Sequence, residues 1–171
     1  RDRSSWHGTF ITGQIAAATD NGLGVAGINW GARILPVRVA GKCGALVSDL
    51  LDGVRWAAGL PVAGVPANPT PAKVINLSFG GDAACTPGYQ DTIDAVTNAG
   101  ALVVVAAGNR DTTLTRPADC RRVMTVASVR KDGAKAAPVK EADKEHTDRK
   151  PRKTRSPLHR SSSIRRRAAR A

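Results

Sequence analysis

Apolar and polar residues alternate in blocks between residues 7 and 129 of the chain. Some blocks are continuous apolar runs rich in β-branched residues, as expected of buried strands; they cover 32–40, 73–81, 101–109 and 122–129. Other blocks carry apolar residues at helical spacing; they cover 7–18, 49–59 and 88–100. Strands that alternate with helices predict a parallel sheet. We therefore expect an α/β fold with three layers, a parallel β-sheet with helices on both faces, which is incomplete in this chain.

Two of the predicted helices carry signals at their ends. Ser48 is a suitable N-cap, and we expect Gly59 and Gly100 to end the second and third helices. The positions expected to face the core follow the helical spacing; they are Leu50, Leu51, Val54 and Ala58 in the second helix and Tyr89, Ile93 and Val96 in the third.

The composition places the basic charge in one part of the chain. Hydrophobic residues make up 42% of the 171 residues but aromatic residues only 4%, so the core must be built from Ala, Val, Ile and Leu. Residues 130–171 hold 15 Lys and Arg against 5 Asp and Glu, which is +10 of the total net charge of +12. We therefore divide the chain into a partial domain over 1–133 and a basic, low-complexity and disordered tail over 134–171.

The change of character near residue 134 is abrupt and has three interpretations. One is an out-of-frame translation of a GC-rich gene. A second is a functional tail that binds polyanions through contacts between Lys or Arg and phosphate. The third is a solvated end without a role. The tail has no aromatic residues to stack on bases, so we expect no sequence-specific nucleic-acid recognition.

Cysteine and hydropathy patterns exclude several classes of protein. The three cysteines allow one disulfide and leave one cysteine over, and none of their spacings is typical of a zinc site. The sequence contains no run of about 18 apolar residues, so no membrane span is predicted. No signal peptide is visible, and because the first residue is Arg1 rather than Met, we expect an upstream part.

Three polar residues are candidates for chemistry. His7 stands beside Gly8 at the start of a predicted helix, a rigid mount for a general base, although a single histidine is more often structural. Asn109 follows a predicted strand and a glycine, where its amide can stabilise an oxyanion or serve as a turn residue. Ser78 is a poor nucleophile candidate because Asn76 stands where a Gly-x-Ser-x-Gly elbow needs glycine.

Four motifs in order resemble one family. The segments "HGTFITGQIAAATDNGLGVAGI", "ILPVRVAGKCGALVSDLLDGVRWAAG", "VINLSFGG" and "VVVAAGN" resemble the subtilisin-like serine proteases (peptidase family S8). The likeness covers about residues 4–133. The "GKCG" segment and a later pair of cysteines resemble the secreted bacterial branch of the family.

The resemblance implies a role for each matching position. His7 corresponds to the general base of a Ser-His-Asp triad, and Asn109 to the oxyanion-hole amide. The remaining implied positions contact the substrate; they are Ser78, Phe79 and Gly80 on one strand, Cys43, Gly44 and Ala45 on the other, and Ala106, Ala107 and Gly108 on a pocket wall.

The resemblance also implies a metal loop and a disulfide. The "DNGLGV" loop is similar to a calcium loop of the family, with Asn21 as a side-chain ligand and Leu23 and Val25 as carbonyl ligands. Cys85 and Cys120 would form the disulfide. The partner of Cys43 would then lie upstream of this chain.

Two departures from the family pattern affect the substrate side of the site. The family reads His-Gly-Thr-His, and Phe10 stands in place of the second histidine. Ala45 replaces a common glycine and adds a Cβ where a peptide must approach closely. We expect both to tune binding rather than abolish it.

Two further departures concern the catalytic residues. The resemblance implies an aspartate in an Asp-Ser/Thr-Gly segment before the histidine and a serine in a Gly-Thr-Ser-Met-Ala segment after it. Asp2 lacks the first context and Ser161–Ser163 lack the second. We expect this chain alone to be inactive, with marginal stability.

The family implies peptide or protein substrates, secretion and a monomer. The alternatives are an inactive fragment or pseudoenzyme with residual peptide binding, and non-specific polyanion binding by the tail.

Overall fold

The computed structural model describes residues 6–41, 44–109, 113–134 and 136. The chain divides into two units, Arg1–Pro138 and Val139–Ala171, and every described residue belongs to the first. Of the predicted disordered tail over 134–171, only Ala134 and Ala136 are described. Both are hydrogen-bonded, since Ala134 N–H donates to Asp132 Oδ1 at 3.0 Å and Ala136 N–H donates to Ser128 O at 3.1 Å. The rest of the tail lies outside the described residues. No helix in the described part of the chain has the length and apolarity of a membrane-crossing segment.

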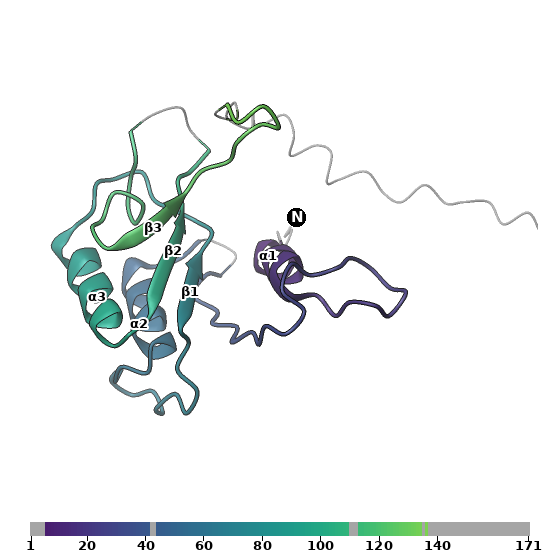
Figure 1. Ribbon diagram of the computed structural model, residues 1–171. Helices are drawn as coiled ribbons and strands as arrows, with labels where there is room; N and C mark the ends of the chain where they lie inside the picture. Colours follow the sequence, from purple (N-terminus) through teal and green to yellow (C-terminus); the bar gives the residue numbers. More distant parts are fainter. Residues whose placement is uncertain (1–5, 42–43, 110–112, 135, 137–171) are drawn as a thin grey trace, which may run out of the picture. The chain divides into compact units, whose positions relative to one another are not determined.

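A parallel sheet forms the centre of the first unit (Figure 1). Its strands are β1 (Val74–Leu77), β2 (Leu102–Ala106) and β3 (Val123–Val126), hydrogen-bonded in the order β1-β2-β3. In the register, Leu77 pairs with Val105, and Val105 with Thr125. All three carboxyl ends therefore lie at one edge of the sheet. The strands fall within three of the four predicted runs, over 73–81, 101–109 and 122–129. Each strand begins at the second residue of its run and ends three residues or more before the end of the run.

Two helices cover one face of this sheet. They are α2 (Val47–Ala57) and α3 (Pro87–Asn98), which lie beside each other in Figure 1. The apolar positions predicted from helical spacing are in the core, with Leu51 partly buried against it. Every second strand residue points to the same core; the buried strand residues are Ile75, Leu77, Val103 and Val105.

The other face of the sheet remains apolar and exposed among the described residues. Val74, Leu102, Met124 and Val126 are between 41% and 57% exposed. The remaining described helix, α1 (His7–Ala16), buries none of its residues. The predicted α/β class with a parallel sheet and an incomplete set of layers is confirmed. In the described part of the chain, α2 and α3 cover one face of the sheet.

The strand predicted over 32–40 is wrong. This segment forms no described strand, because a strand needs a neighbour that accepts and donates its backbone hydrogen bonds. Its side chains still alternate between half-buried and exposed over 35–40, and Val37 and Val39 pack against the core. Gly53 of α2 makes this possible, since a Cβ at this position would clash with Val39 Cγ1.

The helix ends agree with the glycine signals but not with the predicted N-cap. The N-cap of α2 is Leu46, and the Ser48 hydroxyl donates instead to Asp49 Oδ1. At the other end, Gly59 has φ 82° and its N–H donates to Trp56 O, while Leu60 N–H donates to Arg55 O. This is a Schellman motif, and the same pattern ends α3 around Gly100 with φ 88°.

A clamp joins the chain after β1 to the chain before β3. We define it as residues 81–85 with 115–120, held by the disulfide between Cys85 and Cys120, the pair that the family resemblance implied. Backbone bonds run from Gly81 N–H to Arg116 O (2.9 Å) and from Arg116 N–H to Ala83 O (2.9 Å).

Side chains strengthen the clamp. The Thr115 hydroxyl donates to Gly81 O at 2.6 Å, and Cys85 N–H donates to Asp119 Oδ2 at 2.8 Å. The Arg116 guanidinium lies 5.3 Å from the centre of the Tyr89 ring, a cation–π contact. Burial raises the pKa of the Tyr89 phenol, and the charge of Arg116 opposes part of that rise.

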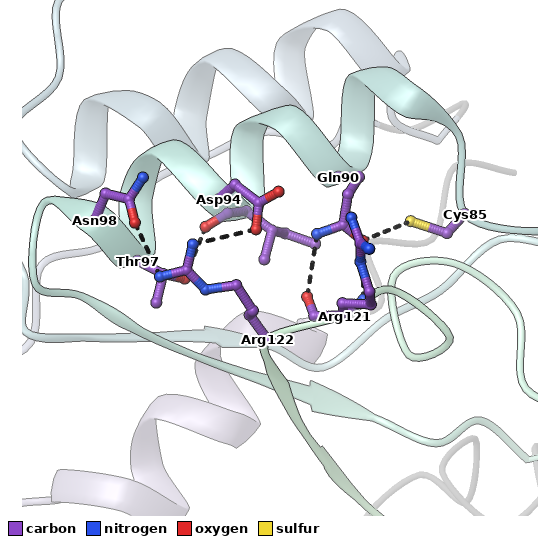
Figure 2. Close-up of polar contacts among 8 residues, drawn as sticks. Cys85, Gln90, Asp94, Thr97, Asn98, Arg121 and Arg122 are labelled. Atoms are coloured by element: carbon purple, nitrogen blue, oxygen red, sulfur yellow. Dashed lines mark hydrogen bonds and ion pairs between the residues drawn. The ribbon is translucent and has the colours of Figure 1, made fainter.

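A second set of polar contacts ties α3 to the turn before β3 (Figure 2). Gln90 Nε2 donates to Arg121 O at 3.3 Å and Gln90 Oε1 accepts from Arg121 N–H at 2.9 Å. Arg122 pairs with Asp94 Oδ1 at 3.3 Å and donates to Asn98 Oδ1 at 2.9 Å. The approach of Cys85 Sγ to Gln90 Oε1 is contact only, because a disulfide sulfur has no hydrogen to donate.

Two helix-ending glycines allow a matched test of the fold. Gly59→Ala and Gly100→Ala both place a Cβ on left-handed backbone, which costs about 1–2 kcal/mol. At Gly59 the new Cβ would also lie 2.6 Å from Pro71 Cγ, whereas nothing lies within 4 Å at Gly100. Urea unfolding should show that Gly59→Ala loses at least about 1 kcal/mol more than Gly100→Ala. Equal losses would mean that Pro71 does not pack against the end of α2.

Removal of the disulfide should destabilise the clamp. Its cysteines are 35 residues apart, so the chain-entropy model gives a loss of about 3–4 kcal/mol in the free energy of unfolding. The double variant Cys85→Ser/Cys120→Ser should show this loss in thermal unfolding. A reductant should lower the melting temperature of the natural chain and leave that of the variant unchanged. A reductant effect of equal size on both would point to a different thiol.

Candidate functional site

His7 is the first residue of α1 and contacts the chain just after β1. Its Nε2 lies 2.9 Å from the backbone oxygen of Ser78, across a sequence separation of 71 residues. Helix α1 begins without a side-chain cap, after Trp6 in left-handed backbone with φ 53°. The imidazole is solvent-exposed. The structure therefore places the predicted base beside the predicted substrate strand.

Ser78, Phe79 and Gly80 continue from the carboxyl end of β1. The Ser78 hydroxyl accepts a hydrogen bond from Asn76 Nδ2 at 2.8 Å, and it is the backbone oxygen of Ser78 that faces His7. Phe79 packs against the core. A Cβ at Gly80 would lie 3.3 Å from Arg116 O, so its glycine allows the clamp to approach. Phe79 and Gly80 thus hold the segment 78–80 against the core and the clamp, while the Ser78 backbone oxygen faces His7.

Ala106, Ala107, Gly108 and Asn109 stand at the matching end of β2. Leu77 pairs with Val105, so the next residues along, Ser78 and Ala106, are adjacent at the carboxyl edge of the sheet. Ala107 N–H donates to Val126 O at 2.9 Å. Gly108 has φ 89°, after which Asn109 is exposed. In open parallel sheets this edge is where ligands bind.

The second predicted substrate strand is described only in part. Cys43 lies outside the described residues. Gly44 has φ 112°, donates its N–H to Gly41 O at 3.3 Å and accepts from Gly41 N–H at 2.8 Å. Both backbone groups of Gly44 therefore already have a partner within the chain. Ala45 is exposed between this bridge and α2.

The predicted calcium loop is a tight surface turn. Asn21 Oδ1 accepts a hydrogen bond from Leu23 N–H at 3.0 Å. Asp20, Gly22 and Gly24 all have positive φ, which curls the backbone around the asparagine. Asn21, Leu23 and Val25 offer only oxygen ligands, a donor set that fits a hard cation, although they supply three of the six to eight oxygens that calcium takes.

Another group of potential ligands lies in the clamp. Cys85, Asp119 and Cys120 bring their ligand atoms within 4.8 Å of one another. The disulfide uses both sulfurs, so neither is a thiolate that could bind a metal. This group serves the clamp.

The structure thus gathers part of the predicted site and adds two residues. His7, 78–80 and 106–109 belong to one edge of the sheet, whereas the 20–25 loop is a separate turn. Sequence reasoning assigned no role to Asn76, although the strand period of two places it on the same side as Ser78. It also missed Arg116, whose contacts to the glycines after β1 carried no sequence signal.

Comparisons with known proteins agree on one family. A model of the Subtilase family matches residues 1–163. The extracellular basic protease of Dichelobacter nodosus is 48% identical over 135 residues, which cover 78% of this chain and 22% of that protein. Thermitase of Thermoactinomyces vulgaris is 35% identical over 133 residues, which cover 77% of this chain and 44% of that protein.

A solved structure extends the likeness to three dimensions. A protease from Pseudoalteromonas arctica matches with a TM-score of 0.75 and 47% identity, covering 80% of this chain and 41% of that one. The extracellular protease of Xanthomonas campestris is also 48% identical, over 78% of this chain and 23% of its own length. The chain spans about a fifth of the two extracellular proteases. Because the family model matches most of the chain and these relatives agree with it, the chain belongs to the subtilase family.

Proposed function

We propose that this chain supplies part of the active site of a serine-type endopeptidase. The single observation that carries the proposal is the contact of His7 with the backbone of Ser78, at the sheet edge that also ends in Asn109. A base, a backbone segment with an exposed carbonyl and an amide donor at one edge are three of the groups that peptide-bond hydrolysis by a serine protease needs, and a nucleophile is a fourth. The substrate class is peptide or protein.

In the proposed mechanism, a peptide lies along 78–80 and its carbonyl points toward Asn109. A serine attacks that carbonyl, His7 accepts the serine proton at Nε2, and the Asn109 amide stabilises the tetrahedral oxyanion. His7 then returns the proton to the leaving amine, and water repeats the sequence to release the acid. The small residues 106–108 would leave room for the side chain before the cleaved bond.

The nucleophile and the orienting carboxylate of this mechanism are not recognisable in the chain. Neither an Asp-Ser/Thr-Gly segment before His7 nor a Gly-Thr-Ser-Met-Ala segment after it is present. In subtilisin, a worked case of non-additive catalysis, loss of the serine alone lowers kcat by about 10⁶. We propose that this chain alone binds peptide without cleaving it. Activity would require segments that supply the nucleophilic serine and the orienting aspartate.

We also propose a structural calcium ion in the 20–25 loop and secretion of the protein. The calcium proposal is supported by the all-oxygen donor set of Asn21, Leu23 and Val25, and the ion would stiffen the turn without entering the reaction. The proposal of secretion is supported by the names of the relatives from D. nodosus and X. campestris, both extracellular proteases.

A chimera tests the catalytic proposal. Residues 6–130 would replace the matching segment of the D. nodosus protease, so that the remaining catalytic groups come from that protein. The chimera should react with a fluorophosphonate probe and cleave peptide, whereas this chain alone should do neither. His7→Ala should lower the kcat of the chimera by about 10⁶, and Asn109→Ala by about 10²–10³.

Gln14→Ala provides the control for the chimera. Gln14 is exposed on α1, and its substitution should leave kcat within a factor of two or so. A folded chimera whose activity survives His7→Ala would refute the assigned base. Labelling of this chain alone would refute the proposed absence of an activated serine.

The calcium proposal has a matched pair of asparagines. Asn29 forms the same kind of turn as Asn21, since its Oδ1 accepts from Gly31 N–H at 3.0 Å. Calcium at about tenfold its dissociation constant should stabilise the natural chain by roughly 1.4 kcal/mol. Thermal unfolding should show that Asn21→Ala loses this response and Asn29→Ala keeps it. Equal responses in both variants would place any calcium elsewhere.

A further inference from the structure

The contact between His7 and Ser78 determines where the imidazole carries a proton. A backbone carbonyl oxygen can only accept hydrogen bonds, so Nε2 at 2.9 Å from it must be the donor. This holds for the neutral ring with its proton on Nε2 and equally for the imidazolium, in which both nitrogens are protonated. In either state Nε2 has no lone pair to offer.

The proposed base function needs the opposite arrangement. To accept the proton of a serine, Nε2 must be bare, and the ring proton must sit on Nδ1, where a carboxylate orients it. A bare Nε2 facing the Ser78 oxygen at this distance would bring two lone pairs together. The bond to Ser78 and the acceptance of a proton by His7 at Nε2 therefore exclude each other.

The same contact bears on substrate binding. An extended peptide that pairs along 78–80 would donate its backbone N–H groups to the exposed carbonyl oxygens of this segment. The Ser78 oxygen already accepts from His7, and the imidazole ring occupies the approach to it. Both partners are at the exposed side of the segment, since Phe79 and the clamp hold its other side.

We propose that the backbone carbonyl of Ser78 is a positioning group that holds His7 in a resting state, with Nε2 protonated and the substrate edge masked. The inference rests on the proposed function, because it concerns the same base and the same substrate strand. Productive binding then requires a peptide to displace the imidazole from Ser78. Ser78 acts here through its main chain, while its hydroxyl stays with Asn76.

Nitrogen NMR of the full chain tests the protonation state. In buffer alkaline enough to neutralise free imidazole, the ¹⁵N shifts of His7 report the share of each tautomer, with His7→Gln assigning its signals. The native chain should show more proton on Nε2 than the same residue shows in urea. The urea reference is needed because free imidazole already favours that tautomer. Native shifts equal to those in urea, or with the proton on Nδ1, would overturn the resting state.

Peptide binding tests the masked edge. The probe is a fluorescein-labelled tetra-alanine amide, followed by fluorescence anisotropy. His7→Ala should bind it roughly two- to tenfold more tightly than the natural chain, the gain expected when one net hydrogen bond no longer competes. Gln14→Ala should bind like the natural chain. Equal or weaker binding by His7→Ala, or no binding by either protein, would overturn the masking.

These outcomes are separate from the catalytic test. The NMR measurement needs neither peptide nor turnover, so an inactive chimera would refute the proposed function and leave the resting state standing. An active chimera, together with His7 shifts that are the same in the native chain and in urea, would support the proposed function and refute the resting state.

Discussion

The register between β1 and β2 is the constraint on which the rest of the site depends. Because Leu77 pairs with Val105, the two strands end together, and the chain leaves both at the same edge of the sheet. Ser78–Gly80 and Ala106–Asn109 are 26 or more residues apart in sequence, yet this pairing makes them neighbours. A slip by one residue would turn the buried side chains of β1 outward and separate the two segments of the site.

The clamp maintains the direction in which the chain leaves β1. Its disulfide, its two backbone bonds and the Thr115 hydroxyl all act on residues 81–85, directly after the segment that faces His7. Small residues are needed here because the backbone oxygen of Arg116 approaches Gly80 and the side chain of Arg116 approaches Gly81. The glycines after β1 thus have a packing role beside the substrate role that the family implies.

The exposed face of the sheet and the single-sided helix layer have one physical consequence. Apolar runs in parallel strands are normally covered on both faces, and here the face with Met124 and Val126 is half-exposed among the described residues. Burial of apolar surface is the main favourable term in folding. A chain that leaves such a face open gains less free energy from apolar burial than a chain whose sheet is covered on both faces.

The sequence alone determined the class of fold, the carboxyl ends of α2 and α3, and the family. Periodicity showed the core positions of α2 and α3, and Gly59 and Gly100 marked the ends because only glycine takes left-handed backbone without strain. Tertiary structure decided the features that depend on a contact with a residue distant in sequence. The 32–40 run has the composition of a strand, but it has no hydrogen-bonded neighbouring strand among the described residues. The N-cap position of α2 is occupied by Leu46 rather than by Ser48. Every residue has a backbone carbonyl, so the sequence could not single out that of Ser78. Its contact with the imidazole exists only because the fold places His7, at the start of α1, beside it.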